Sequence, residues 1–235
     1  MTKYIPNTIT LLNLLSGCLA VVAAFHYGQT ILGLEAATWV YILIAAAAVF
    51  DFCDGFAARA LKAYSNIGAE LDSLSDLVSF GVAPAMLMLN IMLVNGAGLW
   101  AFAAMFIPMM GALRLAIFNV DTTQTTTFRG LPIPANAIFW IGASAWISAH
   151  IYPPTAAIVV IIIAVSLCMV APMRMFSLKF KNLNFRENVL RYAIIVACAA
   201  FLIFYGVEGL MWTILLYILL SAFSKKRSDD ELSAE

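Results

Sequence analysis

Long apolar runs follow one another along almost the whole of this chain of 235 residues. Many of them have the 18 to 25 or so apolar residues that an α-helix needs to cross a bilayer. Hydrophobic residues make up 63% of the chain and charged residues only 11%, whereas a soluble domain is about half apolar and a quarter charged. This composition leaves too little polar surface to cover a water-soluble globule. The sequence therefore predicts an integral membrane protein.

Short connectors that contain Gly, Pro and Asn divide the apolar runs into eight candidate helices. The predicted ranges are 9–27, 36–61, 68–94, 97–119, 132–150, 153–173, 188–206 and 208–223. The predicted fold class is all-α, a polytopic membrane helix bundle of about eight transmembrane helices. An even number of spans places both termini on one side. We expect a single membrane domain over residues 1–225 and a polar C-terminal tail over 226–235.

The basic residues are distributed very unevenly over this topology. With eight spans, all thirteen Lys and Arg residues fall on the face that carries both termini, and none falls on the opposite face. Short loops on the cytoplasmic side of membrane proteins are enriched in Lys and Arg. The sequence therefore predicts a protein of the cell (inner) membrane, with both termini on the cytoplasmic side.

One acidic stretch interrupts the apolar pattern on the same predicted face. It contains Asp51 and Asp54, three residues apart on the second predicted helix, and Asp72 and Asp76, four apart on the third. Each pair therefore shares one face of its helix. Because a short turn joins the two helices, we expect the four carboxylates to converge near the cytoplasmic interface. Carboxylates in apolar surroundings are costly, which indicates a functional site.

Electrostatic repulsion limits the roles of four converging carboxylates. Two unit charges about 4 Å apart repel by roughly 4 kcal/mol at an effective dielectric constant of about 20. Either some carboxylates are protonated or cations lie among them. An all-oxygen ligand set suits Mg²⁺, Mn²⁺ or Ca²⁺, and two such ions can bridge a pyrophosphate during phosphoryl transfer.

Two other interpretations compete with a catalytic metal site. Acidic residues at helix ends can simply reach into the membrane interface, but that explains one or two acids more readily than four at these spacings. A cation-transport site is the second alternative. It would favour the middle of the bilayer and would not need basic residues such as Arg59, Arg114 and Arg129 close by.

The acidic stretch resembles the signature of the CDP-alcohol phosphotransferases, D-x2-D-G-x2-A-R-x8-G-x3-D-x3-D. It has the expected residue at every fixed position: Asp51, Asp54, Gly55, Ala58, Arg59, Gly68, Asp72 and Asp76. The resemblance implies that Asp51, Asp54 and Asp72 ligate metal. It also implies that Asp76 completes a second metal site and acts as the general base. The implied cofactor is a divalent metal, Mg²⁺ or Mn²⁺, with two ions in each active site.

The N-terminal segment IPNTITLLN, at 5–13, resembles the P-N-x-x-T sequence that leads into the first helix of this family. Its Asn7 and Thr10 either reach the nucleotide or only cap the first helix. The family resemblance implies that the two glycines and the alanine of the signature lie against a cytidine nucleotide, and that Arg59 contacts its phosphates. The resulting candidate nucleotide-binding residues are Asn7, Thr10, Asp54, Gly55, Ala58, Arg59 and Gly68.

Three further segments resemble the phosphatidylserine synthase branch of the family: ALRLAIFNV at 112–120, FRGLPIPA at 128–135 and FSLKFK at 176–181. This branch implies transfer of a phosphatidyl group from CDP-diacylglycerol to L-serine, giving phosphatidylserine and CMP. It also implies a homodimer in the lipid bilayer, with no nucleic-acid partner. The candidates for the substrate-phosphate or serine pocket are Arg114, Arg129 and Lys179. The alternatives are the same chemistry with inositol phosphate or glycerol phosphate, and a divalent-cation transporter.

Overall fold

The fold is described from a computed structural model, over residues 4–120, 128–175, 184 and 188–232. This part of the chain is almost entirely helical, and the predicted all-α fold is confirmed. Its helical segments are α1 (Tyr4–Phe25), α2 (Ala36–Ala60), α3 (Asn66–Asp76), η1 (Leu77–Val82), α4 (Ala83–Val94), η2 (Gly98–Met105), α5 (Phe106–Val120), α6 (Ile133–Ala149), α7 (Thr155–Val170), α8 (Val189–Tyr205), η3 (Gly206–Glu208) and α9 (Gly209–Leu232).

Two pairs of very short strands accompany these helices. β1 (Thr30–Ile31) pairs with β2 (Leu34–Glu35) in the connector between α1 and α2. β3 (Phe128–Arg129) pairs with β4 (Arg174–Met175), which joins the segment before α6 to the segment after α7. Gly130, directly after β3, has a φ of 75°, and a Cβ there would lie 2.1 Å from the Met169 carbonyl oxygen. The chain therefore passes very close to the end of α7 before it enters α6.

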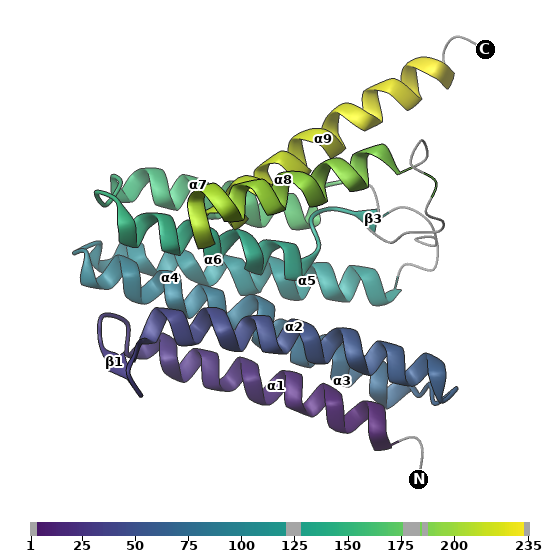
Figure 1. Ribbon diagram of the computed structural model, residues 1–235, viewed down its shortest axis with the longest axis horizontal. Helices are drawn as coiled ribbons and strands as arrows, with labels where there is room; N and C mark the ends of the chain where they lie inside the picture. The colour runs from purple at the N-terminus through teal and green to yellow at the C-terminus, as the bar shows by residue number, and fades with distance from the viewer. Residues whose placement is uncertain (1–3, 121–127, 176–183, 185–187, 233–235) are drawn as a thin grey trace.

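Each of the eight predicted ranges contains helix. By length and composition, five helical stretches of the described residues can cross a membrane, at 4–25, 36–60, 66–94, 98–120 and 189–222, and α6 and α7 are shorter apolar helices. The stretch 189–222 contains a reversal at Gly206, whose φ is 58°. After it, α9 runs back along α8, as Figure 1 shows. These apolar helices fit an integral membrane protein, whereas the number of crossings stays a prediction.

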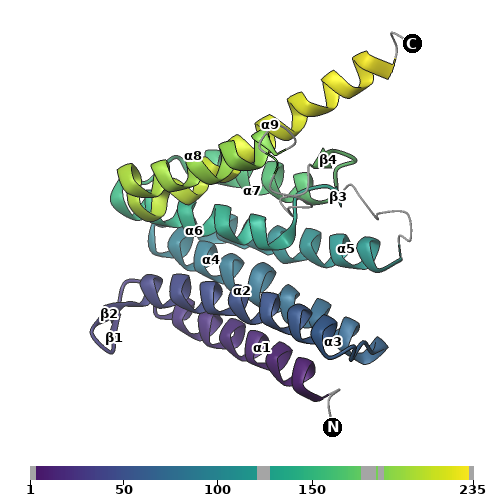
Figure 2. The same ribbon diagram turned by 45° about the vertical axis from the view of Figure 1, so that its right-hand side comes forward.

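The helices form a layered bundle (Figures 1 and 2). α1 and α2 pack against each other at one side, and α8 and α9 cover the other side, where α9 contacts α6. Between them lies a core whose fully buried side chains include Phe80, Met88, Ile107 and Trp140. The start of α1 and the end of α9 lie at the same end of the bundle, in agreement with an even number of helical passes.

The helix that carries two of the clustered acids changes its winding directly after Asp76. α3 continues into the π-helical η1, where the N–H of Ala83 bonds to the carbonyl of Val78, five residues back. Pro84, near the start of α4, has no N–H with which to continue a regular hydrogen-bond ladder. Short π-helical turns occur frequently at functional sites. η1 contacts α1, α5 and α6, so Asp76 lies next to the centre of the bundle.

The turn between α2 and α3 is tighter than predicted. The expected turn over 62–67 ends earlier, because α3 begins at Asn66. The Ser65 hydroxyl caps α3 by accepting a hydrogen bond of 3.0 Å from the N–H of Gly68. α1 packs against both α2 and α3, so one helix contacts both elements that carry the aspartates.

Candidate active site

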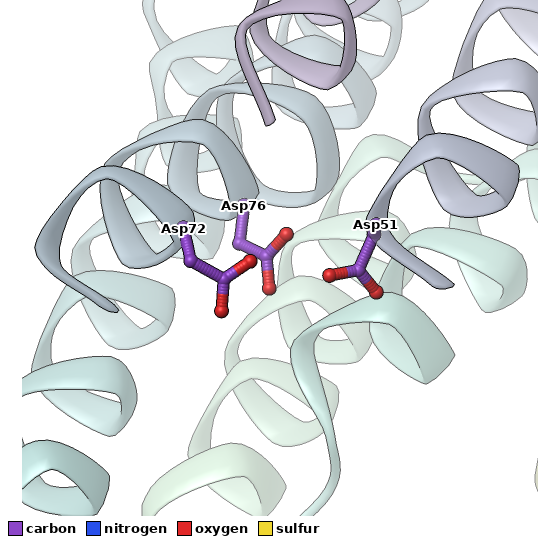
Figure 3. A group of neighbouring side chains, drawn as sticks. All are labelled: Asp51, Asp72 and Asp76. Carbon is purple, nitrogen blue, oxygen red and sulfur yellow. The ribbon is translucent and has the colours of Figure 1, made fainter. Parts of the chain in front are cut away.

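Three of the four predicted aspartates form a compact cluster. Asp51 comes from α2, and Asp72 and Asp76 come from α3. Carboxylate oxygens of all three lie within 4.8 Å of one another. Figure 3 shows Asp51 pointing across toward the two side chains of α3. The convergence of the two helix faces, predicted from the spacing, is therefore present in the structure.

The cluster has the donor set of a divalent-metal site. Asp51 and Asp72 are half-buried, and Asp76 is buried with 9% of its surface exposed. Oδ1 of Asp72 is buried, and it has no hydrogen-bond partner among the described residues. Three carboxylates this close repel one another strongly unless a cation or a proton lies between them. Oxygen ligands of this kind fit Mg²⁺ or Mn²⁺.

Asp54 is not part of this compact group and contacts α1. Its Oδ2 accepts a hydrogen bond of 2.6 Å from the Thr10 hydroxyl, and both side chains are buried. Asp54 therefore faces α1, while Asp51, almost one turn earlier on α2, faces Asp72 and Asp76. The role of Asp54 as a metal ligand stays a prediction.

A cavity of about 170 Å³ adjoins the acidic cluster, between the start of α1, the end of α2 and the start of α3. Six of the seven predicted nucleotide-binding residues line it, and Asp72 connects it to the cluster. The complete lining is Pro6, Asn7, Thr10, Asp54, Gly55, Ala58, Ala63, Tyr64, Ser65, Gly68, Ala69 and Asp72. The sequence segments that resemble the family signature and its N-terminal lead therefore meet around one space.

Small residues keep this cavity open. A Cβ on Gly68 would lie 3.0 Å from Ser65 Oγ and 3.1 Å from Asn7 Oδ1, closer than nearly all real contacts of this type. A side chain at Gly55 would extend toward the guanidinium of Arg59, whose Nη1 lies 3.4 Å from the Cβ position. Arg59 is the seventh predicted residue. It is exposed, and its guanidinium lies close to Gly55, which lines the cavity.

Arg114 is the member of the predicted substrate pocket that the structure brings to the acids. It lies on α5 with 8% of its surface exposed, and it interacts electrostatically with Asp76 and with Tyr217 of α9. Its Nε has no hydrogen-bond partner within the described residues. Arg129 pairs with Arg174 through the backbone of β3 and β4, and its side chain is not described. Lys179 lies outside the described residues.

Two residues near the site are missing from the sequence-based prediction of the site. Asn13 of α1 is fully buried, and its Nδ2 donates a hydrogen bond of 3.2 Å to Oδ1 of Asp76. The sequence carries a signal for it, because Asn7, Thr10 and Asn13 recur every three residues and so share one face of an apolar helix. The buried Tyr217 has no such signal, since it approaches Arg114 from a helix about a hundred positions further along the chain.

Comparisons with known proteins show which family this sequence resembles. The family model of the CDP-alcohol phosphatidyltransferases matches residues 3–176. The CDP-diacylglycerol–serine O-phosphatidyltransferase of Bacillus subtilis is 33% identical over 180 residues, which are 77% of this chain and 91% of the relative. The protein of that name from Methanocaldococcus jannaschii is 36% identical over 162 residues, 69% of this chain and 71% of the relative. The one from Mycobacterium leprae is 38% identical over 150 residues, 61% and 47% of the two chains.

Proposed function

Because the chain belongs to the CDP-alcohol phosphatidyltransferase family, we propose that it transfers the phosphatidyl group of CDP-diacylglycerol to L-serine, giving phosphatidylserine and CMP. The observation that carries this proposal is the cluster of Asp51, Asp72 and Asp76 beside the cavity that the predicted nucleotide-binding residues line. The names of the relatives support serine as the acceptor.

The metal site of this proposal uses all four aspartates of the signature. Asp51, Asp72 and Asp76 would hold two Mg²⁺ or Mn²⁺ ions together with Asp54, which lines the cavity as Asp72 does. When bound, the two ions neutralise the diphosphate and stabilise the charge that develops on the departing CMP. The nucleotide would occupy the cavity between α1, α2 and α3, with Arg59, close to Gly55, against the phosphates.

Asp76 is the proposed general base. A serine hydroxyl is a weak nucleophile until its proton is removed, and a positioned carboxylate can take that proton. The serine oxygen then attacks the phosphorus that carries the diacylglycerol, and the bond from that phosphorus to CMP breaks in line. Burial of Asp76 in the bundle keeps bulk water away from the base, which favours transfer to serine over hydrolysis.

Arg114 provides the main physical argument for serine over a phosphorylated alcohol. It places one buried positive charge beside Asp76, which matches the single carboxylate of serine. Inositol phosphate and glycerol phosphate carry a phosphate of higher charge and would call for additional basic side chains. Arg129 and Lys179 are proposed on the strength of the family resemblance to face the phosphates of CDP-diacylglycerol and not the acceptor.

The proposed setting is the cytoplasmic face of the cell membrane. The apolar helices would keep the acyl chains of both lipids in the bilayer, while the nucleotide and serine enter from the cytoplasm. The distribution of the thirteen basic residues supports this orientation. A homodimer is part of the proposal through the family resemblance.

The test is CMP release by the purified protein in vesicles that contain CDP-diacylglycerol and Mg²⁺ or Mn²⁺. We expect release that depends on serine, with formation of phosphatidylserine, and no release after chelation of the metal with EDTA until either ion is returned. Faster release with inositol phosphate or glycerol phosphate than with serine would contradict the proposed acceptor. Flux of divalent cations through the protein without CMP release with any of the three alcohols would favour a transporter instead.

A further inference from the structure

The carboxylate of Asp76 receives a hydrogen bond from a helix that carries none of the aspartates. Nδ2 of Asn13, on α1, donates to Oδ1 of Asp76 over 3.2 Å. Asn13 is fully buried, and Asp76 has 9% of its surface exposed, so water competes little for this bond. We propose that Asn13 is a positioning residue, which holds the Asp76 carboxylate in the orientation in which it meets Asp51 and Asp72.

The backbone of Asn13 is itself attached to the helix that carries Asp76. The Ser79 hydroxyl, in η1, donates a hydrogen bond of 3.0 Å to the carbonyl oxygen of Asn13. Gly17, one turn further along α1, lies so close to η1 that a Cβ there would be 2.3 Å from Ser79 Oγ. α1 therefore contacts the chain at Asp76 and again at Ser79, and these two contacts determine where the Asn13 amide lies.

The amide oxygen of Asn13 indicates that the hydrogen bond donated by the N–H group is the reason for an amide at this position. Oδ1 of Asn13 is buried, and the described part of the chain offers it no hydrogen-bond partner. An unpaired buried carbonyl oxygen destabilises the fold, whereas an apolar side chain of similar size would carry no such penalty. The bond to Asp76 is the contact of this side chain that compensates for that penalty.

Orientation matters for Asp76 because its carboxylate can rotate about the Cβ–Cγ bond. Nearby carboxylates would otherwise turn it away from the cluster by repulsion. A hydrogen bond to Oδ1 opposes that rotation and leaves Oδ2 for a metal ion or for the proton of the acceptor. Hydrogen bonds from neighbouring groups orient metal ligands in this way in many proteins, and their loss weakens metal binding by about 10 to 100-fold.

The inference rests on the metal site of the proposed function but not on the identity of the acceptor, so its test measures metal binding. Mn²⁺ affinity of the full-length protein in detergent, followed by electron paramagnetic resonance, is compared for the wild type, Asn13→Leu, Asp76→Asn and the double variant. We expect Asn13→Leu to lower the affinity by about tenfold or more. We expect the double variant to bind like Asp76→Asn alone, because residues that act through one another give non-additive effects.

A purely structural role for Asn13 predicts a different result. The two substitutions would then lower the affinity independently, and their effects would multiply in the double variant. Either that outcome or wild-type affinity in Asn13→Leu overturns the inference. If Asn13→Leu does not fold, Asn13→Ala replaces it in the same comparison of four proteins, since it removes the amide without adding volume. Ser166→Ala is the matched control, because Ser166 is a buried polar residue of α7.

Measurements of CMP release with serine distinguish a failure of this inference from a failure of the proposed acceptor. With serine, Asn13→Leu should lower kcat by about tenfold or more while KM for serine changes little, since Asn13 acts on Asp76 and not on the substrate. If the two substitutions have non-additive effects on Mn²⁺ affinity in a protein that releases no CMP with serine, the role of Asn13 is upheld and serine is contradicted as the acceptor. Failure of the wild type to bind Mn²⁺ would overturn both the metal site and the role of Asn13.

Discussion

Asp76 combines several interactions that set it apart from the other aspartates. It is the buried member of the cluster, it accepts the hydrogen bond from Asn13, and it interacts electrostatically with Arg114. Asp54 and Asp72, in contrast, line the cavity that we assign to the nucleotide. These contacts support the proposal that Asp76 removes the proton while Asp54 and Asp72 face the nucleotide.

This separation leads to a prediction for Asp76→Asn. We expect turnover with serine to fall by about 100-fold to 10,000-fold, which is the usual contribution of a general base, while CMP binding changes by less than about threefold. The measurements are CMP release and isothermal titration calorimetry with CMP. Glu70→Gln is the control, because Glu70 is an exposed acid on the same helix. Retained turnover in Asp76→Asn would remove Asp76 as the base.

Thr10 offers a second prediction at the residue scale. Its hydroxyl donates a buried hydrogen bond of 2.6 Å to the Asp54 carboxylate, and Val has nearly the same shape without the donor. Hydrogen bonds to charged groups contribute about 1.5 to 3 kcal/mol, so Thr10→Val should weaken CMP binding by about tenfold or more. Calorimetry with CMP measures this effect. The control is Thr8→Val, because Thr8 is exposed on α1 and bonds to the carbonyl of Tyr4. Equal affinities in the two variants would contradict the role of Thr10.

The sequence predicts the residues of this site better than their contacts. Helix periodicity alone brings Asp51 together with Asp72 and Asp76, because spacing determines which face of a helix a residue occupies. Spacing does not determine side-chain direction within a face. Asp54 therefore appears in the same predicted group, although the hydroxyl of Thr10 holds it toward α1. The bond from Asn13 to Asp76 joins residues 63 positions apart, which local patterns do not reveal.

At the scale of elements, α1 organises the site although it carries no aspartate. It packs against α2, α3, η1 and α4. Its buried face consists of small or polar residues, among them Thr10, Asn13, Ser16 and Gly17, while larger apolar side chains such as Leu15 and Leu19 are exposed toward the surroundings. Small residues let transmembrane helices approach closely, and polar residues form hydrogen bonds between them. The packing of α1 thus fixes the distance between the two acid-bearing helices.

Gly17→Ala tests this packing. A Cβ at Gly17 would lie 2.3 Å from Ser79 Oγ and 2.8 Å from Ser79 Cα, so either α1 or η1 must move. Overpacking of this kind destabilises a fold by about 1 to 3 kcal/mol. We expect a lower midpoint of thermal unfolding together with a loss of turnover, because the same movement displaces Asn13 from Asp76. Cys18→Ala, an exposed position next to Gly17, should match the wild type in both measurements. A Gly17→Ala protein with wild-type stability and turnover would show that α1 tolerates displacement.

The elements also show where sequence patterns stop being informative. Long apolar runs and the breakers between them predict most helix ends to within three residues, because length and hydrophobicity decide what a membrane accepts. The start of α1 is an exception, since the helix begins at Tyr4 and not at the predicted residue 9. The π-helical turn η1 keeps the apolar composition of its neighbours and so leaves no pattern of its own. The approach of Tyr217 to Arg114 depends on how α8 and α9 fold back on the bundle. α9 also continues as helix to Leu232, beyond the predicted end of the last span at 223.

At the scale of the whole molecule, several helix ends gather at one end of the bundle. The turn between α2 and α3, the start of α1 and the end of α9 lie there, as Figures 1 and 2 show. The connector between α6 and α7 lies at the opposite end. This arrangement is compatible with the predicted even number of passes, whereas the side of the membrane on which each end lies stays a prediction.

Cysteine labelling tests this assignment on intact cells. The four native cysteines, Cys18, Cys53, Cys168 and Cys198, are first replaced by Ala. One cysteine is then introduced at Leu61, in the exposed turn after α2, or at Ile151, which is 93% exposed between α6 and α7. Neither change alters a basic residue, so the charge distribution that orients the protein is kept. A membrane-impermeant maleimide should label Ile151→Cys in intact cells and leave Leu61→Cys unlabelled until the cells are opened.

The reason for this expectation is the cost of moving charge across the bilayer. Turning the bundle over would require the segments that carry all thirteen Lys and Arg residues to cross the membrane. Inverted membrane vesicles should give the reverse labelling pattern, and both cysteines should react in detergent, which controls for their accessibility. Labelling of Leu61→Cys in intact cells would place the acidic cluster on the outer face of the membrane. That result would contradict the proposal that the nucleotide and serine enter the site from the cytoplasm. Labelling of both positions from the same side would instead contradict the predicted number of crossings between them.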